Sequence, residues 1–194
     1  DDGWAVIVHC NRSITQAKHL IKRGVGAVVS GDLSNDEDLF RLIEEIHDHE
    51  LVEKSGGIDL LIHNASIYHE EDFSTITPQE LRRFTSIHLD APFFMTQGLV
   101  PKIKEKKGSI IGIVDTSWGQ SWENLSHYTA TKAALRQLLI NLSGELAPEI
   151  RVNGVAPGAI LAAAWEKDRF EEVLKQVPMG RACLLYTSDA ADES

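Results

Sequence analysis

The sequence predicts an α/β fold, a doubly wound parallel sheet of the Rossmann type in a single domain. Two observations support this prediction. Short runs rich in β-branched residues, typical of buried parallel strands, alternate with longer segments whose apolar residues recur at helical spacing. The length of 194 residues is usual for one domain with one core. Alternation of this kind implies right-handed crossovers that place helices on both faces of the sheet.

Five apolar runs are predicted to be the strands, with one helix in each interval between them. The strands are expected at 5–9, 25–29, 58–62, 109–114 and 150–155, and the helices at 13–24, 34–56, 77–107 and 126–147. Three of the helices begin with a capping box, in which side chains three residues apart satisfy free backbone amides. The pairs are Ser13 with Gln16, Ser34 with Glu37, and Thr77 with Glu80.

Composition and charge exclude several function classes. Lysine and arginine total 19 against 29 aspartate and glutamate residues, which gives a net charge of −10. This sign opposes binding to nucleic-acid phosphates, and no apolar run approaches the ~18 residues of a membrane span. The two cysteines, Cys10 and Cys183, are too few for a disulfide framework and lack metal-binding spacing. We expect a cytoplasmic protein that binds neither nucleic acid nor membrane.

Both ends of the sequence bear on the domain boundaries. The chain opens at Asp1 without an initiator methionine and enters a strand almost at once, so we expect the natural N-terminus to lie upstream. Residues 183–194 resemble the translation of an adapter used in preparing sequencing libraries; the alternative is an ordinary acidic tail. We therefore predict a domain over 1–182, incomplete at both ends, and a non-native tail over 183–194.

Residues just beyond the strands are the first candidates for chemistry, because parallel sheets place their sites at the carboxyl ends of the strands. Asp115 follows the fourth run, and Tyr128 and Lys132 lie in the first turns of the next helix. Tyrosine and lysine four residues apart share one helix face, so the ammonium group of Lys132 can favour ionisation of the phenol. The pair is a candidate general acid or base, although this spacing also occurs on ordinary amphipathic helices.

Two further motifs accompany this pair, Asn64-Ala65 after the third run and Pro157-Gly158 after the fifth. With these motifs the chain resembles the short-chain dehydrogenase/reductase family over 1–182. The resemblance implies hydride transfer with a nicotinamide cofactor, a homotetramer, and the strand order 3-2-1-4-5-6-7. By that order the chain begins at the second strand and lacks the first, central strand with its glycine-rich turn. We therefore expect the chain alone to be inactive.

Within the family the likeness is greatest to the pteridine and dihydromonapterin reductases. Asp115 stands where most members carry the catalytic serine, and Ser66 where most carry glycine. The strings at 11–13, 32–34, 63–68, 157–161 and 177–181 also resemble these enzymes. The resemblance implies reduction of a pterin ring by NADPH, with Asp115, Tyr128 and Lys132 as the catalytic residues.

The residues after the first run give a physical reason for NADPH. Arg12 and Ser13 lie where a cation, free amides and the dipole of a helix start favour a 2′-phosphate; alternatively they are a solvated charge and a helix cap. Asp32 could accept a hydrogen bond from adenine, or it is a turn residue. The resemblance implies a cofactor-binding set of Asn11, Arg12, Ser13, Asp32, Leu33, Asn64, Ala65, Ser66, Tyr128, Lys132, Pro157 and Gly158.

A flat pterin requires a stacking ring and a positioned proton donor. Tyr68 is the predicted ring, although it could be an ordinary loop tyrosine. Ser66 is expected at the polar edge of the substrate or at the cofactor phosphates. Asp115, beside Tyr128, is expected to pass a proton to a ring nitrogen.

Two other functions stay open. Thr116 or Ser117 could supply a displaced hydroxyl, in which case the substrate is a ketone or a 3-oxoacyl group. A regulator that binds the dinucleotide without catalysis is the second, and the joint presence of Asn64, Tyr128 and Lys132 argues against it.

Histidines supply one departure from the family pattern and no metal site. His88 occupies a helix position where many members place an asparagine that binds a proton-relay water, which puts that relay in doubt. Dihydromonapterin reductases can show the same change. His47 and His49 are expected on different faces of one helix, so we predict that they do not share a metal ion.

Overall fold

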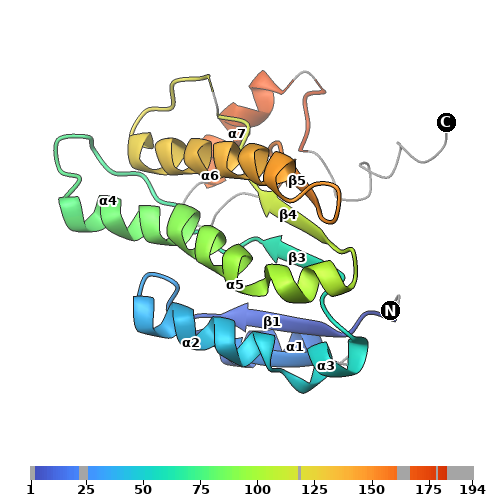
Figure 1. The fold of residues 1–194 in the computed structure, drawn as a ribbon. Helices are drawn as coiled ribbons and strands as arrows, with labels where there is room; N and C mark the ends of the chain where they lie inside the picture. Colours follow the sequence, from blue (N-terminus) through green and yellow to red (C-terminus); the bar gives the residue numbers. More distant parts are fainter. Residues whose placement is uncertain (1–2, 22–25, 118, 161–166, 178, 183–194) are drawn as a thin grey trace.

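The computed structural model describes residues 3–21, 26–117, 119–160, 167–177 and 179–182. Strands and helices alternate along it (Figure 1), which confirms the predicted Rossmann-like α/β fold in one domain. The strands are β1 (Val6–Cys10), β2 (Gly26–Ser30), β3 (Leu60–His63), β4 (Ser109–Ile113) and β5 (Arg151–Val155). The helices are α1 (Ile14–Ile21), α2 (Asp36–His47), α3 (Glu50–Ser55), α4 (Pro78–Thr85), the π-helical turn η1 (Ser86–Asp90), α5 (Ala91–Glu105), α6 (Ser126–Glu145) and α7 (Lys167–Gln176).

All described strand pairs are parallel, but they form two sheets. β1 pairs with β2, and β3, β4 and β5 form a second sheet in that order. Within the described residues no ladder joins β1 to β3, so the facing edges of these two strands do not pair with each other. The five strands lie within two residues of their predicted positions.

One core holds the two sheets together. Figure 1 shows α2, α5 and α6 on one side of the strands and α1 on the other. Leu39 and Leu42 of α2 join Leu99 of α5 and Leu139 of α6 in a single buried cluster. Gly98 of α5 lies so near Ile43 of α2 that a Cβ there would clash, so glycine permits the close approach of these helices. The core therefore continues across the position where the hydrogen bonding is interrupted.

The segment predicted as one helix over 34–56 is two helices, and its predicted cap is wrong. The side chain of Asn35, not of Ser34, accepts a hydrogen bond from Asp38 N at the start of α2. The Ser34 hydroxyl donates to Asp32 instead. The chain then breaks at His49, whose side chain accepts from Leu51 N and caps α3. His49 is therefore a cap rather than a residue on the face of one helix with His47.

The predicted helix over 77–107 is continuous but contains the π-helical turn η1 between α4 and α5. Proline has no amide hydrogen, so Pro92 cannot make the helical hydrogen bond to the carbonyl of His88. Thr77 caps α4 as predicted, with its side chain accepting from Glu80 N. The turn carries the buried His88 towards the core.

One further predicted helix is present, and several predictions fall outside the described residues. The helix predicted over 126–147 is α6, and α7 was not predicted at all. The predicted helix end at Gly24, the loop position Leu161 and the tail over 183–194 lie outside the described residues. In the part of the chain that the structure describes, no helix has the length and apolar character needed to cross a bilayer.

Candidate active site

The candidate active site forms where β4 ends and α6 begins. Asp115 lies two residues beyond β4, and its Oδ2 accepts a hydrogen bond from the Tyr128 hydroxyl at 2.8 Å. Its Oδ1 accepts from the amide of Ser117 at 2.7 Å. The carboxylate is therefore fixed on both oxygens, with one of them turned to the phenol. The predicted contact between Asp115 and Tyr128 is present.

Lys132 lies one turn beyond Tyr128 on α6 and is almost fully buried, with 4% of its surface exposed. Its Nζ donates to the carbonyl of Ile113 at 2.8 Å and lies 5.9 Å from the centre of the Tyr128 ring. Burial lowers the pKa of Lys132, and the Asp115 carboxylate opposes that shift. The cation is therefore held against the end of β4, next to the pair that could exchange a proton.

Together these three side chains can hold and transfer a proton. The phenol of Tyr128 donates to a carboxylate, and the ammonium group of Lys132 offsets a negative charge shared by that pair. A substrate atom near Tyr128 Oη could receive the proton of the phenol, and the phenolate, stabilised by Lys132, would then take up a proton from water. The arrangement can supply acid or base chemistry. The described residues contain no cluster of three His, Cys, Asp or Glu suited to a metal ion.

The loop after β3 lies over this group. The rings of Tyr68 and Tyr128 pack with their centres 4.8 Å apart at an angle of 59°. Phe84 and Leu125 form the buried base of the same cluster, against which Tyr68 and Trp122 pack. The structure thus brings Tyr68 to the site, as the prediction of a stacking ring requires. Asn64, Ala65 and Ser66 are exposed at the carboxyl end of β3.

His88 joins this loop to α6, a connection that sequence reasoning missed. Its Nε2 lies 2.9 Å from Ser66 Oγ, and its Nδ1 lies 2.8 Å from Thr131 Oγ1. Burial, with a smaller contribution from the charge of Lys132, lowers the pKa of His88 to about 3. Thr131 lies directly before Lys132 and one turn after Tyr128, on the buried face of α6. That spacing was the available signal that Thr131 faces the site.

Asn11, Arg12, Ser13 and Asp32, which are predicted to bind the cofactor, follow the carboxyl ends of β1 and β2 and are called the cofactor end. Figure 1 shows β1, β3 and β4 pointing the same way, so these ends share one side of the molecule with the Tyr128 site. Asn11, Arg12 and Ser13 are all exposed between β1 and α1. Pro157 and Gly158 follow β5, and Leu33 packs against the core.

Asp32 is engaged within its own turn. Its Oδ1 accepts from the amide and the hydroxyl of Ser34, at 2.9 and 2.7 Å. The hydroxyl of Ser34 is the largest influence that lowers the pKa of Asp32, and Asn11 and Arg83 lower it further. Asp32 thus makes the hydrogen bonds of a turn residue, its predicted contact with adenine stays a prediction, and Arg83 of α4 is a further charge near it.

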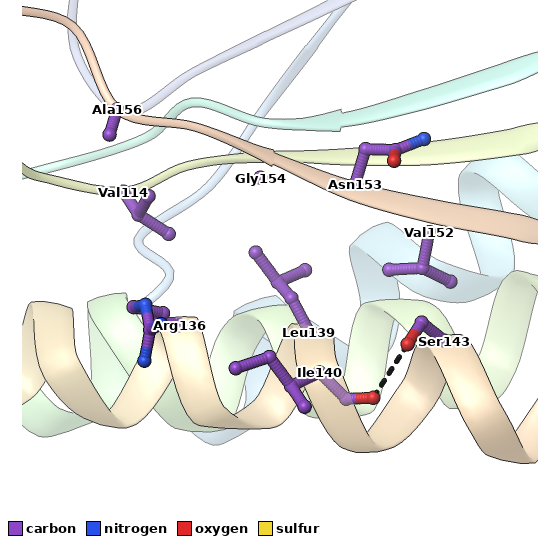
Figure 2. Close-up of a pocket in the computed structure, with 9 residues that line it drawn as sticks. All are labelled: Val114, Arg136, Leu139, Ile140, Ser143, Val152, Asn153, Gly154 and Ala156. Atoms are coloured by element: carbon purple, nitrogen blue, oxygen red, sulfur yellow. Dashed lines mark hydrogen bonds between the residues drawn. The ribbon is translucent and has the colours of Figure 1, made fainter.

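Two surface grooves lie away from Tyr128. One, of about 290 Å³, runs between β5 and α6, where Leu139 points from the helix towards Gly154 (Figure 2). The other, of about 260 Å³, lies against the exposed face of the second sheet and is lined by Trp4, Leu60 and Arg151 among others. Neither groove contains Asp115 or Tyr128, so the candidate site rests on its side-chain geometry.

A model of the short chain dehydrogenase family matches residues 1–173. The chain belongs to the short-chain dehydrogenase/reductase family. The expectation drawn from Asn64-Ala65, Tyr128, Lys132 and Pro157-Gly158 is thereby confirmed at the level of the family.

Relatives of several activities match the chain. A glucose and ribitol dehydrogenase homolog from Oryza sativa subsp. japonica is 32% identical over 167 residues, which cover 79% of this chain and 54% of that protein. The dihydromonapterin reductase of Enterobacter sp. (strain 638) is 30% identical over 143 residues, covering 72% of this chain and 58% of that protein. The chain thus spans a little over half the length of these curated relatives.

A solved structure with bound NADP has the same fold. FolM alternative dihydrofolate reductase 1 from Brucella canis, complexed with NADP, matches with a TM-score of 0.81 and 28% identity. The match covers 97% of this chain and 75% of that chain. The fold of this chain is therefore that of an NADP-binding relative.

Proposed function

We propose that the complete protein is an NADPH-dependent oxidoreductase that reduces the ring of a dihydropteridine, dihydromonapterin or dihydrofolate. The observation that carries this proposal is the 2.8 Å hydrogen bond from the Tyr128 hydroxyl to Asp115. A carboxyl group at this position can deliver a proton to a ring nitrogen, which a serine hydroxyl does poorly. The likenesses to a dihydromonapterin reductase and to FolM support the same substrate class.

The proposed cofactor fits the exposed residues after β1. A guanidinium group at Arg12 and the free amides at the start of α1 suit the 2′-phosphate of NADPH. Asn64, Ala65 and Ser66, together with Pro157 and Gly158, would line the rest of the dinucleotide. The bound nicotinamide supplies the hydride for the reaction.

The chain's own residues would then manage the proton and the substrate ring. Tyr68 would form one wall of the pterin site, since its ring already packs near that of Tyr128. Asp115, after taking up a proton from water, would deliver it to a ring nitrogen, and the Tyr128 hydroxyl and Lys132 would stabilise the carboxylate that remains. Ser66 would contact the polar edge of the substrate or the cofactor phosphates from the exposed loop after β3.

Asp115→Ser is the experiment that tests the substrate class. It gives the site the residue usual in carbonyl-reducing relatives, so pterin reduction should fall far more than any reduction of simple ketones. The measurement is steady-state turnover of the full-length protein with dihydrofolate, a dihydropterin and a panel of ketones. Pterin turnover that stays within about twofold in the variant, or a wild type that reduces ketones and no pterin, would refute the proposal.

Reduction of a ketone or 3-oxoacyl group is the second candidate, favoured by the likeness to the glucose and ribitol dehydrogenase homolog. It requires a hydroxyl beside the phenol. The two candidates for it are Thr116, which is exposed, and Ser117, which is 3% exposed and meets Asp115 through its backbone amide. A non-catalytic regulator is the third candidate, and bound cofactor without turnover on the whole panel would favour it.

We also propose that the chain, a domain over 1–182 with a non-native tail over 183–194, is part of a longer cytoplasmic protein that forms a homotetramer. The interrupted pairing between β1 and β3 supports a strand from outside this chain at that position, together with the turn that approaches the cofactor. Residues 1–182 alone should neither bind NADPH tightly nor turn over. Micromolar NADPH affinity with cooperative unfolding of 1–182 would contradict this, and light scattering of the full-length protein tests the tetramer.

A further inference from the structure

His88 is a fully enclosed histidine that contacts two distant parts of the chain. It lies on the π-helical turn η1 and is 0% exposed. Its two ring nitrogens face Ser66 Oγ in the loop after β3, at 2.9 Å, and Thr131 Oγ1 on α6, at 2.8 Å. The amide of Ile67 adds a longer contact to Nε2, at 3.4 Å.

The partners of Thr131 fix which nitrogen of His88 carries its proton. Thr131 Oγ1 lies 3.0 Å from the carbonyl of His127 and 2.9 Å from that of Tyr128. A carbonyl can only accept, so Thr131 can give its one hydrogen to the backbone of α6, and the amide of Ile67, which can only donate, needs a lone pair on Nε2. Both contacts are satisfied when Thr131 accepts from His88. Nδ1 therefore bears the hydrogen, and Nε2 presents a lone pair.

The other end of the ring then orients Ser66. The Ser66 hydroxyl lies 3.4 Å from the carbonyl of Ile67 but only 2.9 Å from Nε2, so, since Nε2 is an acceptor, its hydrogen points inward to His88. The lone pairs of Ser66 Oγ are left on the exposed side of the loop, where a ligand can donate to them. A second proton on His88 is disfavoured, because burial and the nearby charge of Lys132 hold its pKa near 3.

We infer that His88 is a positioning residue, permanently neutral and protonated on Nδ1, that ties the loop bearing Ser66 and Tyr68 to the helix bearing Tyr128 and Lys132. It is not a proton relay. A relay through Nδ1 would need a partner able to pass the proton on, and the hydroxyl of Thr131 is already donating to the carbonyls of its own helix. The effect on turnover rests on the proposed function, whereas the protonation state does not.

Solid-state ¹⁵N NMR of histidine-labelled full-length protein tests the protonation state without any assay of activity. His88, assigned by difference against His88→Gln, should show one protonated and one unprotonated nitrogen, unchanged between pH 5 and 9. In Thr131→Val the proton should lose its preference for Nδ1 while the ring stays neutral. A His88 that titrates in this range, or that carries its proton on Nε2, would overturn the inference.

Two matched variants test the positioning role. The amide of asparagine can reach the Nδ1 position and that of glutamine the Nε2 position, so His88→Asn keeps the contact to Thr131 and His88→Gln keeps the contact to Ser66. The Michaelis constant for dihydrofolate should rise about tenfold in His88→Asn and stay within about threefold in His88→Gln. The pH profile of kcat should be the same in both.

Several outcomes separate this role from others. A shifted or flattened pH profile in His88→Asn would show that His88 does transfer protons, and equal losses in both variants would show that it only fills space. If His88→Asn fails to fold, Ser66→Ala should raise the same Michaelis constant by a similar factor, and Ser66→Ala with His88→Gln should raise it no further. A wild type without dihydrofolate turnover refutes the proposed function, while the NMR result still decides the state of His88.

Discussion

The two sheets of the molecule hold their predicted site residues in different ways. Around β3, β4, β5 and α6, the side chains of Asp115, Tyr128 and Lys132 are buried or half-buried and hydrogen-bonded to protein atoms. Around β1 and β2, the side chains of Asn11, Arg12 and Ser13 are exposed. The fold alone thus positions these three groups, proposed to move a proton, whereas Asn11, Arg12 and Ser13, proposed to bind the cofactor, meet solvent.

This difference has a consequence for mutations. Removing the Tyr128 hydroxyl from the second sheet's site should impair proton transfer, with little change in cofactor affinity. Removing the Arg12 guanidinium group beside the first sheet should change affinity and leave the chemistry intact. Variants beside each sheet test the two roles separately.

Tyr128→Phe should have the largest effect. The change removes the oxygen that contacts Asp115 and keeps the ring that packs against Tyr68. Turnover of dihydrofolate by the full-length protein should fall by roughly 10²–10⁴, with NADPH affinity nearly unchanged. Steady-state kinetics and fluorescence titration of NADPH measure the two quantities. A matching loss of NADPH affinity would contradict the proposed separation of roles.

Arg12→Ala should weaken the binding of NADPH and leave turnover nearly unchanged. Loss of one charge-assisted contact to the 2′-phosphate, worth about 1.5–3 kcal/mol, should raise the Michaelis constant for NADPH much more than that for NADH. Turnover at saturating NADPH should change little, because Arg12 lies on the exposed connection after β1. Lys18, on the helix that follows, is a matched control cation, and Lys18→Ala should affect both cofactors equally. Equal effects of Arg12→Ala on both cofactors would give Arg12 a structural role.

The strands and the contact between Asp115 and Tyr128 could be predicted from the sequence. Alternating apolar runs located all five strands, and the fixed polarity of a parallel sheet then brought Asp115 and Tyr128 together. It was harder to predict which of two neighbouring residues caps a helix. Ser34 and Asn35 can both cap a helix, and Asn35 caps α2 because the Ser34 hydroxyl binds Asp32.

Contacts between distant segments were the least predictable. The sequence marked His88 only as a departure from the family pattern, since nothing local indicates that it reaches Ser66 and Thr131. Its burial depends on the π-helical turn before Pro92 and on the packing of α6 against that turn. The interruption between β1 and β3 is a property of pairing across the sheet, and it was expected only from the strand order of the resembling family.

Acid should destabilise the second sheet's site through His88. The unfolded chain binds a proton on histidine near pH 6.5, whereas folded His88 stays neutral down to about pH 3, because burial and Lys132 oppose its charge. Its contribution to stability is therefore complete above pH 6.5 and is lost as the pH falls from about 6.5 to 3. Between pH 7 and pH 5 the loss should be about 2 kcal/mol.

Urea unfolding of the full-length protein at several pH values measures this loss. His63, whose pKa is lowered to about 4 by burial, should add a similar slope, so His88→Gln should remove about half of the combined dependence. His47→Gln is the control, because His47 lies on the exposed side of α2. An unchanged slope in His88→Gln would mean that His88 is not held neutral by the fold.

The smallest predicted effect concerns the first sheet, where local structure rather than a buried network positions the chain before α2. The side chain of Asn35 accepts from Asp38 N at 2.9 Å and satisfies a free amide of the first turn. Asn35→Ala should therefore cost about 1 kcal/mol in the free energy of unfolding. Ser34→Ala, which leaves that cap in place, should cost only a few tenths of this, although it removes one of the two hydrogen bonds to Asp32 Oδ1. Urea unfolding compares the two variants directly. If Ser34→Ala costs more than Asn35→Ala, then the turn around Asp32 is the stronger constraint, and the cofactor end is positioned by its own hydrogen bonds as firmly as the Tyr128 site.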